Sequence, residues 1–257
     1  MEVLAGDLRR PATYRAALAA CDVCLSAALD FQDPAGTDRL LLETLRGLPP
    51  AAGGTRRLLV YTSCGAAYGP VLAPLLDEAT PGNPAHPLHF RLELEQEVFA
   101  LDNVRTVVVR PGFLYGQDGR SCFASTWFEQ GEAGRVVYGG NLARAWSWLH
   151  VSDLANAYGC LLAHPGLDRE VFCLADKHAP RGLDVARAAA RAAGFTGPVE
   201  VGPALMEDDS ALFDHQMLLS PAKARRVLGW APQQPGVLAD MARCYQGWLA
   251  AQRLASY

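Results

Sequence analysis

The chain has 257 residues, of which 50% are hydrophobic, and its formal net charge is -4. This length is enough for one large domain or two modest ones, and the hydrophobic share supplies a sizeable core. The acidic balance argues against a broad nucleic-acid surface, which would need clustered Lys and Arg. No apolar run reaches the roughly 18 residues of a membrane span, and the start lacks the apolar stretch of a secretory signal. We therefore expect a cytoplasmic protein with a small-molecule substrate, no nucleic-acid partner and no membrane partner.

The seven cysteines are scattered along the chain. An odd number at irregular spacing favours reduced core thiols over a disulfide framework. Cys21 and Cys24 form a C-x-x-C pair, but a zinc site would need a second pair. The pair runs into the apolar stretch CDVCLSAA, which is typical of a strand, whereas a redox motif sits at a helix N-terminus. We predict core cysteines and no metal, with a redox or metal role for this pair as the alternative.

Strand-like runs alternate with helical patterns through the first half of the chain. The predicted strands are 3–6, 22–28, 56–63 and 103–112, and the predicted helices are about 11–20, 34–48 and 86–101. The run 103–112 is continuously apolar, which is typical of a parallel strand covered on both faces. Repeated strand–helix–strand units with short connections predict a doubly wound parallel sheet.

The alternation of strands and helices becomes less regular after about residue 117. The predicted elements there are helices near 121–132 and from Asp153, a strand at 171–175, and helices at 183–193, 220–229 and 236–252. Asp153 is expected to be the N-cap of its helix. Ser220 is expected to cap the next-to-last helix, with Pro221 at its first position and Gly229 at its end. His150 is expected to be a core histidine, and the nearby Trp146 and Trp148 line either a cleft or the core.

Six stretches occur in a specific order along nearly the whole chain. They are VLAGDL (3–8), ACDVCLSAA (20–28), LLVYTSCGAAYG (58–69), RTVVVRPGFLYG (105–116), WSWLHVSDLANAY (146–158) and LSPAKARRVLGWAPQ (219–233). Together they resemble the strand ends and turns of the extended short-chain dehydrogenases, the NAD(P)-dependent epimerases, dehydratases and reductases. The resemblance implies an α/β, Rossmann-like doubly wound parallel sheet in residues 1–117. It also implies a small C-terminal α/β substrate-binding part in residues 118–257, interleaved with the last sheet strands.

The resemblance also implies NAD or NADP as cofactor and a sugar nucleotide, or another small carbonyl or hydroxyl compound, as substrate. A homodimer could form through the helix 86–101, where Leu88, Leu92 and Phe99 serve either that contact or the sheet.

Ligands of doubly wound sheets bind at the carboxyl ends of the strands. The positions that the resemblance assigns to the cofactor are Asp7, Ser26, Ala27, Ala28, Thr62, Arg110, Pro111, Gly112 and Phe113. It places Asp7 at the adenine, the turn 26–28 at the pyrophosphate and ribose, and 111–113 at the nicotinamide. Each assignment has an alternative: Asp7 caps the next helix, Ser63 satisfies the local backbone, and Arg110 pairs with a helix carboxylate.

Two departures from the family pattern concern function. The family begins with a strand and a G-x-x-G-x-x-G turn that places pyrophosphate at a helix N-terminus, and this sequence has no such motif. In the family's sheet the two absent strands lie between the third and the fourth, so we expect an N-terminally truncated sheet. The flank of the strand 22–28 should then be exposed.

The second departure is the family's catalytic Y-x-x-x-K pair. Pro87 stands at the tyrosine, Arg91 at the lysine and Cys64 at the helper serine. Arg91 could bond a ribose, but its pKa is too high for a proton shuttle. His89 could be a general acid–base near neutral pH, or only a surface residue.

The predicted catalytic groups are therefore Ser63, Cys64, His89 and Arg91, in an enzyme of atypical type. The alternative is a non-catalytic dinucleotide-binding or scaffold member, or a truncated inactive form.

Overall fold

The computed structural model describes residues 2–51, 54–116, 122–202 and 215–255. The first half contains α1 (Arg15–Ala20), β1 (Val23–Ser26), α2 (Pro34–Arg46), β2 (Arg57–Thr62), α3 (Phe90–Phe99), β3 (Val104–Pro111) and β4 (Phe113–Tyr115), with 3-10 turns η1 (Pro11–Thr13), η3 (Gly65–Tyr68) and η4 (Pro87–His89). The second half contains α4 (Ser125–Glu132), β5 (Val137–Tyr138), β6 (Trp148–His150), α5 (Val151–Ala163), β7 (Glu170–Leu174), α6 (Gly182–Ala192), β8 (Glu200–Val201), α8 (Ala222–Leu228) and α9 (Val237–Ala255). No described helix is long and apolar enough to cross a bilayer.

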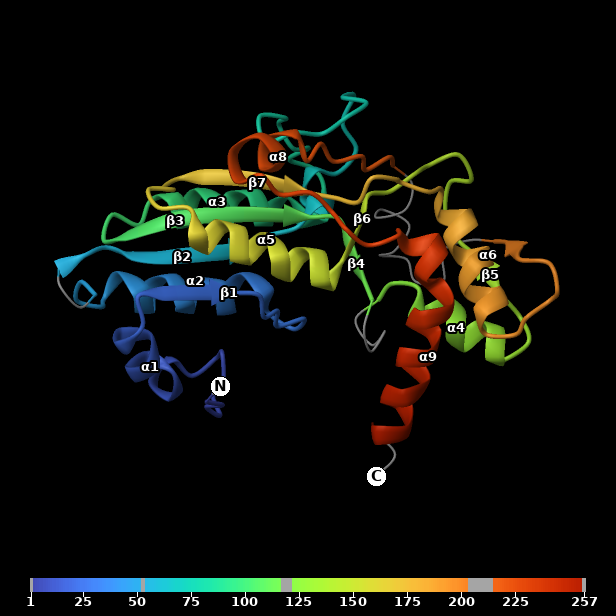
Figure 1. Cartoon of the computed structure of the whole chain (residues 1–257), viewed down its shortest axis with the longest axis horizontal. Coiled ribbons are helices and arrows are strands. Elements are labelled where there is room, and N and C mark those ends of the chain that lie inside the picture. The colour runs from blue at the N-terminus through green and yellow to red at the C-terminus, as the bar shows by residue number, and fades with distance from the viewer. Residues whose placement is uncertain (1, 52–53, 117–121, 203–214, 256–257) are drawn as a thin grey trace.

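Four parallel strands form the main sheet in the order β1-β2-β3-β7, which confirms the doubly wound parallel sheet. Helices α2 and α3 lie on one face, and α5 lies on the other (Figure 1). In β3, Val108 packs with Leu45 of α2, while Val107 and Val109 pack with Leu154 of α5. This two-sided burial explains why the strand 103–112 is continuously apolar.

The predicted strand 3–6 is wrong, because residues 2–7 have no regular structure. Strand β1 pairs only with β2, so residues 2–7 do not add to its free edge and form no ladder. Val3 and Leu4 are accordingly 82% and 63% exposed. On β1 itself, Val23 and Leu25 are each 39% exposed, which confirms the expected open flank of this strand.

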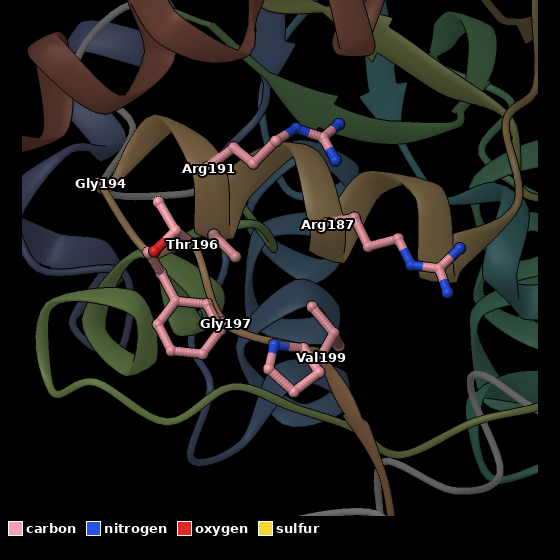
Figure 2. Close-up of a pocket in the computed structure, with 9 residues that line it drawn as sticks. Arg187, Arg191, Gly194, Thr196, Gly197 and Val199 are labelled. Carbon is pink, nitrogen blue, oxygen red and sulfur yellow. The ribbon is translucent and has the colours of Figure 1, made fainter.

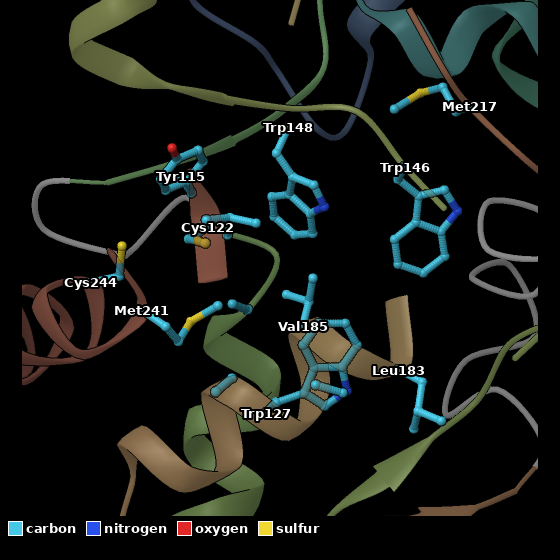
Figure 3. Close-up of a cluster of buried hydrophobic side chains, with 14 of the residues drawn as sticks. Tyr115, Cys122, Trp127, Trp146, Trp148, Leu183, Val185, Met217, Met241 and Cys244 are labelled. Atoms are coloured by element: carbon cyan, nitrogen blue, oxygen red, sulfur yellow. The ribbon is translucent and has the colours of Figure 1, made fainter. Parts of the chain in front are cut away.

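The C-terminal part packs α4, α6 and α9 around an aromatic core (Figure 3). Trp146 and Trp148 are fully buried there, which confirms the core alternative for these two residues. The two-stranded sheet β4–β6 leads from the main sheet into this part, and the chain then returns through α5 to β7. The boundary that we expect at 117–118 lies outside the described residues.

Four of the seven cysteines are in the core, and all seven are free. Burial raises the pKa of Cys24 to about 11 and that of Cys173 to about 12, so these thiols stay protonated at neutral pH. Cys21 is exposed, contrary to the prediction, because it is the C-cap of α1 and precedes β1.

The cap predictions for α5 and α8 need correction. His150, not Asp153, is the N-cap of α5, and its Nδ1 accepts a hydrogen bond from the Ser152 backbone N–H at 3.0 Å. In α8 the cap is Pro221 rather than Ser220, so this helix starts one residue later than predicted. Gly229 ends α8 with φ of 64°, as predicted.

Asp153 has a different role from the predicted one. Its buried carboxylate accepts hydrogen bonds from the backbone N–H groups of Gln233 and Gln234, both at 3.0 Å. It therefore fastens the segment that leads into α9 to the start of α5.

We expect Asp153→Asn to lower the free energy of unfolding by about 1–3 kcal/mol, because one of the two partly buried hydrogen bonds loses its charged acceptor. Urea unfolding would measure the effect. Asp184→Asn in the first turn of α6, where the carboxylate faces solvent-accessible arginines, is the control and should change little. Equal effects of the two substitutions would contradict the fastening role.

Candidate functional site

The carboxyl ends of the four parallel strands lie along one edge of the sheet. The register pairs Ser26 with Tyr61, Thr62 with Val109, and Pro111 with Leu174. Most of the predicted cofactor positions are therefore brought together at this edge, which has small residues at the ends of β1 and β3.

Asp7 lies in the exposed N-terminal segment, which the ion pair between Arg9 and Asp30 ties to the chain just after β1. Its carboxylate accepts a hydrogen bond from the Arg9 backbone N–H at 2.9 Å and lies 3.4 Å from the Arg10 guanidinium. The N-cap of the next helical turn, η1, is Arg10, so Asp7 does not cap it.

Ser63 follows β2 and has a buried hydroxyl without a hydrogen-bond partner among the described residues. Its backbone N–H donates to the Val109 carbonyl at 2.8 Å, but its Oγ satisfies no local backbone group. Buried hydroxyls are nearly always paired, so an unpaired one marks a place for an additional polar group. Thr62 differs, because its hydroxyl is hydrogen-bonded to Tyr158 of α5 at 2.7 Å.

Gly112 lies where the end of β3 meets the chain before β6. Its N–H donates to the Leu174 carbonyl at 2.9 Å, and a Cβ atom here would lie 2.5 Å from the Ser147 carbonyl oxygen. Only glycine fits this close approach. The neighbouring Phe113 ring packs 5.2 Å from Phe123 and 5.6 Å from Trp148, between ring centroids, so it belongs to the aromatic core.

Arg91 is held in a buried network at the start of α3. Its Nη1 lies 3.1 Å from the Asp38 carboxylate of α2 and 3.3 Å from the Tyr61 hydroxyl of β2. Tyr61 in turn donates to Asp38 at 2.6 Å. Burial raises the pKa of both Asp38 and Tyr61. This guanidinium fastens two helices to the sheet, a role that the sequence alone did not indicate.

Cys64 and His89 are the other two predicted catalytic residues. Burial raises the pKa of the Cys64 thiol, while the Arg91 charge acts in the opposite direction. The thiol is thus within electrostatic reach of Arg91 but stays protonated near neutral pH. His89 is half-buried in η4, and its Nδ1 is enclosed without a hydrogen-bond partner in the described part of the chain.

Arg110 forms a buried ion pair with Glu95 of α3. The guanidinium donates from Nη2 at 2.5 Å and from Nε at 3.0 Å, and its Nη1 donates to the Tyr68 hydroxyl at 2.5 Å. The side chains of Arg110 and Glu95 are 7% and 0% exposed. This is the helix-carboxylate alternative that the sequence left open, and it directs the charge of Arg110 into the interior.

Sequence reasoning missed Asp176, which comes two residues after β7 at the same edge. Both of its carboxyl oxygens are buried without a hydrogen-bond partner among the described residues, and burial raises its pKa to about 6. The Tyr115 phenol lies beside it without a well-formed hydrogen bond. An acidic residue directly after a predicted strand was the signal that could have identified it.

His150 lies close to this acidic group. Its ring is 5.1 Å from that of Tyr115, between centroids, and its Nε2 is 3.5 Å from the Asp240 carboxylate of α9. Burial lowers the pKa of His150. A cavity of about 290 Å³ opens beside it and is lined by His150, Ser152, Gln234 and Arg243.

A known protein family matches more than half of the chain. Residues 13–175 match the model of the NAD dependent epimerase/dehydratase family. The chain belongs to this family. Its parallel sheet and strand-end site agree with the Rossmann-like fold expected for such a member.

Several solved structures are similar to nearly the whole chain. UDP-glucose 4-epimerase from Thermotoga maritima, solved with UDP-glucose, is 17% identical, with 96% of this chain and 84% of that chain covered and a TM-score of 0.75. MoeE5, solved with UDP-glucuronic acid and NAD, is 16% identical, with coverages of 96% and 85% and a TM-score of 0.79. RMD from Pseudomonas aeruginosa, solved with NADPH, is 21% identical, with coverages of 96% and 88% and a TM-score of 0.74. At these identities the likeness establishes the fold.

A curated relative is the chloroplast stem-loop binding protein of 41 kDa b from Arabidopsis thaliana. It is 30% identical over 132 residues, which make up 49% of this chain and 35% of the relative. The chain therefore spans about a third of the length of this relative.

Proposed function

We propose that this chain binds NAD or NADP along the carboxyl edge of its sheet and is an atypical oxidoreductase of the epimerase/dehydratase type. Its substrate would be a sugar nucleotide or another small carbonyl or hydroxyl compound. The observation that carries the proposal is the unpaired, buried Ser63 hydroxyl at an edge that it shares with Ser26 and Gly112. Family membership and the ligands of the similar solved structures support it.

The small residues at the edge support a dinucleotide as the ligand. In the proposal, the turn of Ser26, Ala27 and Ala28 lies against the pyrophosphate and ribose, and Pro111 to Phe113 lie against the nicotinamide. Ala27 and Ala28 are exposed and small, so they leave room for a ligand against the backbone. The cofactor, when bound, would supply hydride transfer.

Three further residues remain proposed cofactor contacts, but they differ in how free their polar groups are: Asp7, Thr62 and Arg110. Asp7 is exposed and close to two arginines, whereas the polar groups of Thr62 and Arg110 already have partners inside the protein. We propose that Thr62 and Arg110 act mainly by holding the strand ends in place.

Some of the proposed catalytic residues would contact the substrate, and Arg91 would act on the residues around them. Ser63 would hydrogen-bond the reacting oxygen of the substrate, and His89 would hold or accept its proton. Arg91 would support the site through its charge near Cys64, since its own proton is too tightly held for transfer. No tyrosine stands at position 87, which makes the proposed active site atypical.

Binding without turnover is the alternative. The engagement of Arg91 with Asp38, and of Arg110 with Glu95, favours it, because these cations serve the interior of the protein. A substrate screen with bound cofactor separates the two: conversion of the substrate, with or without a net change in the nicotinamide, supports the enzyme. Intact cofactor binding without any substrate conversion supports the non-catalytic member.

We propose a small-molecule partner rather than nucleic acid, supported by the net charge of -4, and a cytoplasmic location. A homodimer through η4 and α3 is also proposed, although Leu88 of η4 and Phe99 of α3 already pack partly within their own chain.

Calorimetric titration with NADH and NADPH tests the proposal. We expect a dissociation constant on the order of micromolar for at least one of them. Ala27→Glu should weaken binding about tenfold or more, because its carboxylate would repel the pyrophosphate. Ala133→Glu, at the exposed end of α4, introduces the same charge away from the edge and should leave the affinity unchanged. Absence of binding by the folded protein, or equal effects of both substitutions, would refute the proposal.

A further inference from the structure

A groove on the outer side of the C-terminal part is separate from the sheet edge. It has a volume of about 600 Å³ and is lined by Arg187, Ala190, Arg191, Gly194, Phe195, Thr196, Gly197, Pro198 and Val199. None of these residues belongs to the four-stranded sheet. The volume is within the range of sites for small organic ligands.

The end of α6 and the turn after it form the walls of the groove. Gly194, with φ of 83°, reverses the chain, and the Phe195 N–H returns to the Ala190 carbonyl at 2.9 Å. Phe195 packs against the aromatic core, and a Cβ atom on Gly197 would lie 2.7 Å from the Phe195 ring. The ring is therefore held between the core and a glycine, which makes this apolar wall a fixed part of the fold.

Two arginines one helical turn apart line the same groove (Figure 2). The shortest ion pair of Arg187 is with Asp184 at 3.8 Å, and Arg181 holds that carboxylate more closely at 2.8 Å. Arg191 forms no ion pair with the described residues. Compensation of the helix dipole accounts for a cation in the last turn of α6, but not for the second arginine one turn earlier.

The groove contains no acidic residue among its lining side chains. Glu200, which follows directly in the chain, is paired with Arg135 at 2.8 Å. Two arginine side chains and an apolar wall thus line the same groove, in a chain whose net charge is negative. Guanidinium groups bind carboxylates and phosphates, and the wall of Phe195, Pro198 and Val199 suits a ring or a short apolar group.

We propose that this groove binds a small organic anion: a phosphate or carboxylate attached to a ring or a short apolar group. The anionic end lies between Arg187 and Arg191, and the apolar part lies against Phe195 and Pro198. This site is independent of the proposed dinucleotide site at the sheet edge.

Phenyl phosphate is the test probe, and inorganic phosphate is its counterpart without a ring. We expect saturable calorimetric binding of phenyl phosphate to the full chain, about tenfold or more tighter than that of inorganic phosphate. Arg191→Gln should weaken phenyl phosphate binding about tenfold, because a hydrogen-bonded cation is lost. Arg187→Gln should act in the same direction.

Arg226→Gln is the matched control, since Arg226 is an exposed helix arginine on α8, outside the groove. It should leave the affinity for phenyl phosphate unchanged, as should Ala27→Glu at the sheet edge. Circular dichroism would verify that each variant is folded. The proposal is overturned if phenyl phosphate does not bind, if it binds no tighter than inorganic phosphate, or if the groove and control variants bind it equally.

Discussion

Replacing Glu95 with glutamine should lower the free energy of unfolding by about 3–5 kcal/mol, the usual cost of breaking a buried ion pair from one side. Arg110 would remain in the interior with its charge but without its carboxylate, since its side chain is only 7% exposed. The guanidinium also donates to Tyr68, so a network of three side chains would lose its anion. Chemical denaturation would measure the loss.

Glu97→Gln on the same helix is a matched control for this substitution. Glu97 also accepts a two-nitrogen hydrogen bond from an arginine, Arg39, but the two side chains are 39% and 46% exposed. Solvent screens that pair, so its loss should cost less than about 1 kcal/mol. Similar costs for Glu95→Gln and Glu97→Gln would show that burial does not govern the contribution of these pairs.

Asp176→Asn should stabilise the protein at pH 7.5 by about 2–3 kcal/mol and reduce the pH dependence of its stability. The pKa of Asp176 is raised to about 6 in the folded state, chiefly by burial, from an ordinary value of 3.8. The folded state therefore binds the proton more tightly than the unfolded state does. Stability from this group is fully present below pH 3.8 and is lost as the pH rises through about 6. A pKa difference of one corresponds to roughly 1.4 kcal/mol, which sets the expected magnitude.

The measurement is the free energy of unfolding in urea at several pH values between 4 and 8, with the variant compared with the parent at each. The comparison isolates Asp176, because His150, whose lowered pKa acts in the opposite direction, is present in both proteins. Asp102→Asn is the control, since that side chain is 91% exposed. If Asp176→Asn left the pH slope of the parent unchanged, the buried carboxyl could not be the group that titrates near pH 6.

Much of the sheet could be predicted from local patterns. Strands β2 and β3 are buried on both faces, so their residues are mostly apolar without alternation. This continuous apolar run can be recognised in the sequence. The end of α8 at Gly229 was readable for a similar reason, since a left-handed residue after a helix favours glycine. Because parallel strands end at one edge, the grouping of Ser26, Ser63 and Gly112 followed from the strand order.

Partnerships between distant residues were harder to read. Glu95 is 15 positions from Arg110, and Asp38 is 53 positions from Arg91, so no local period relates the partners. Periodicity on α3 favoured an apolar face, whereas Arg91 and Glu95 are among the buried positions, because each meets an opposite charge. A buried charge is tolerated only where the fold supplies its partner.

The sequence by itself determined the alternation of strands and helices, the parallel sheet and the edge at which its strands end, because these depend on hydrophobic period and chain connectivity. The tertiary structure alone decided that residues 3–6 form no strand, since a strand exists only where it pairs with a neighbour and this segment does not pair with the free edge of β1. It also decided that Asp153 holds the segment before α9 instead of capping α5, and that the buried Asp176 carboxyl has no hydrogen-bond partner in the described part of the chain. Both outcomes depend on which groups the folded chain places within a few ångströms of a carboxylate, and that proximity is a property of the packed molecule.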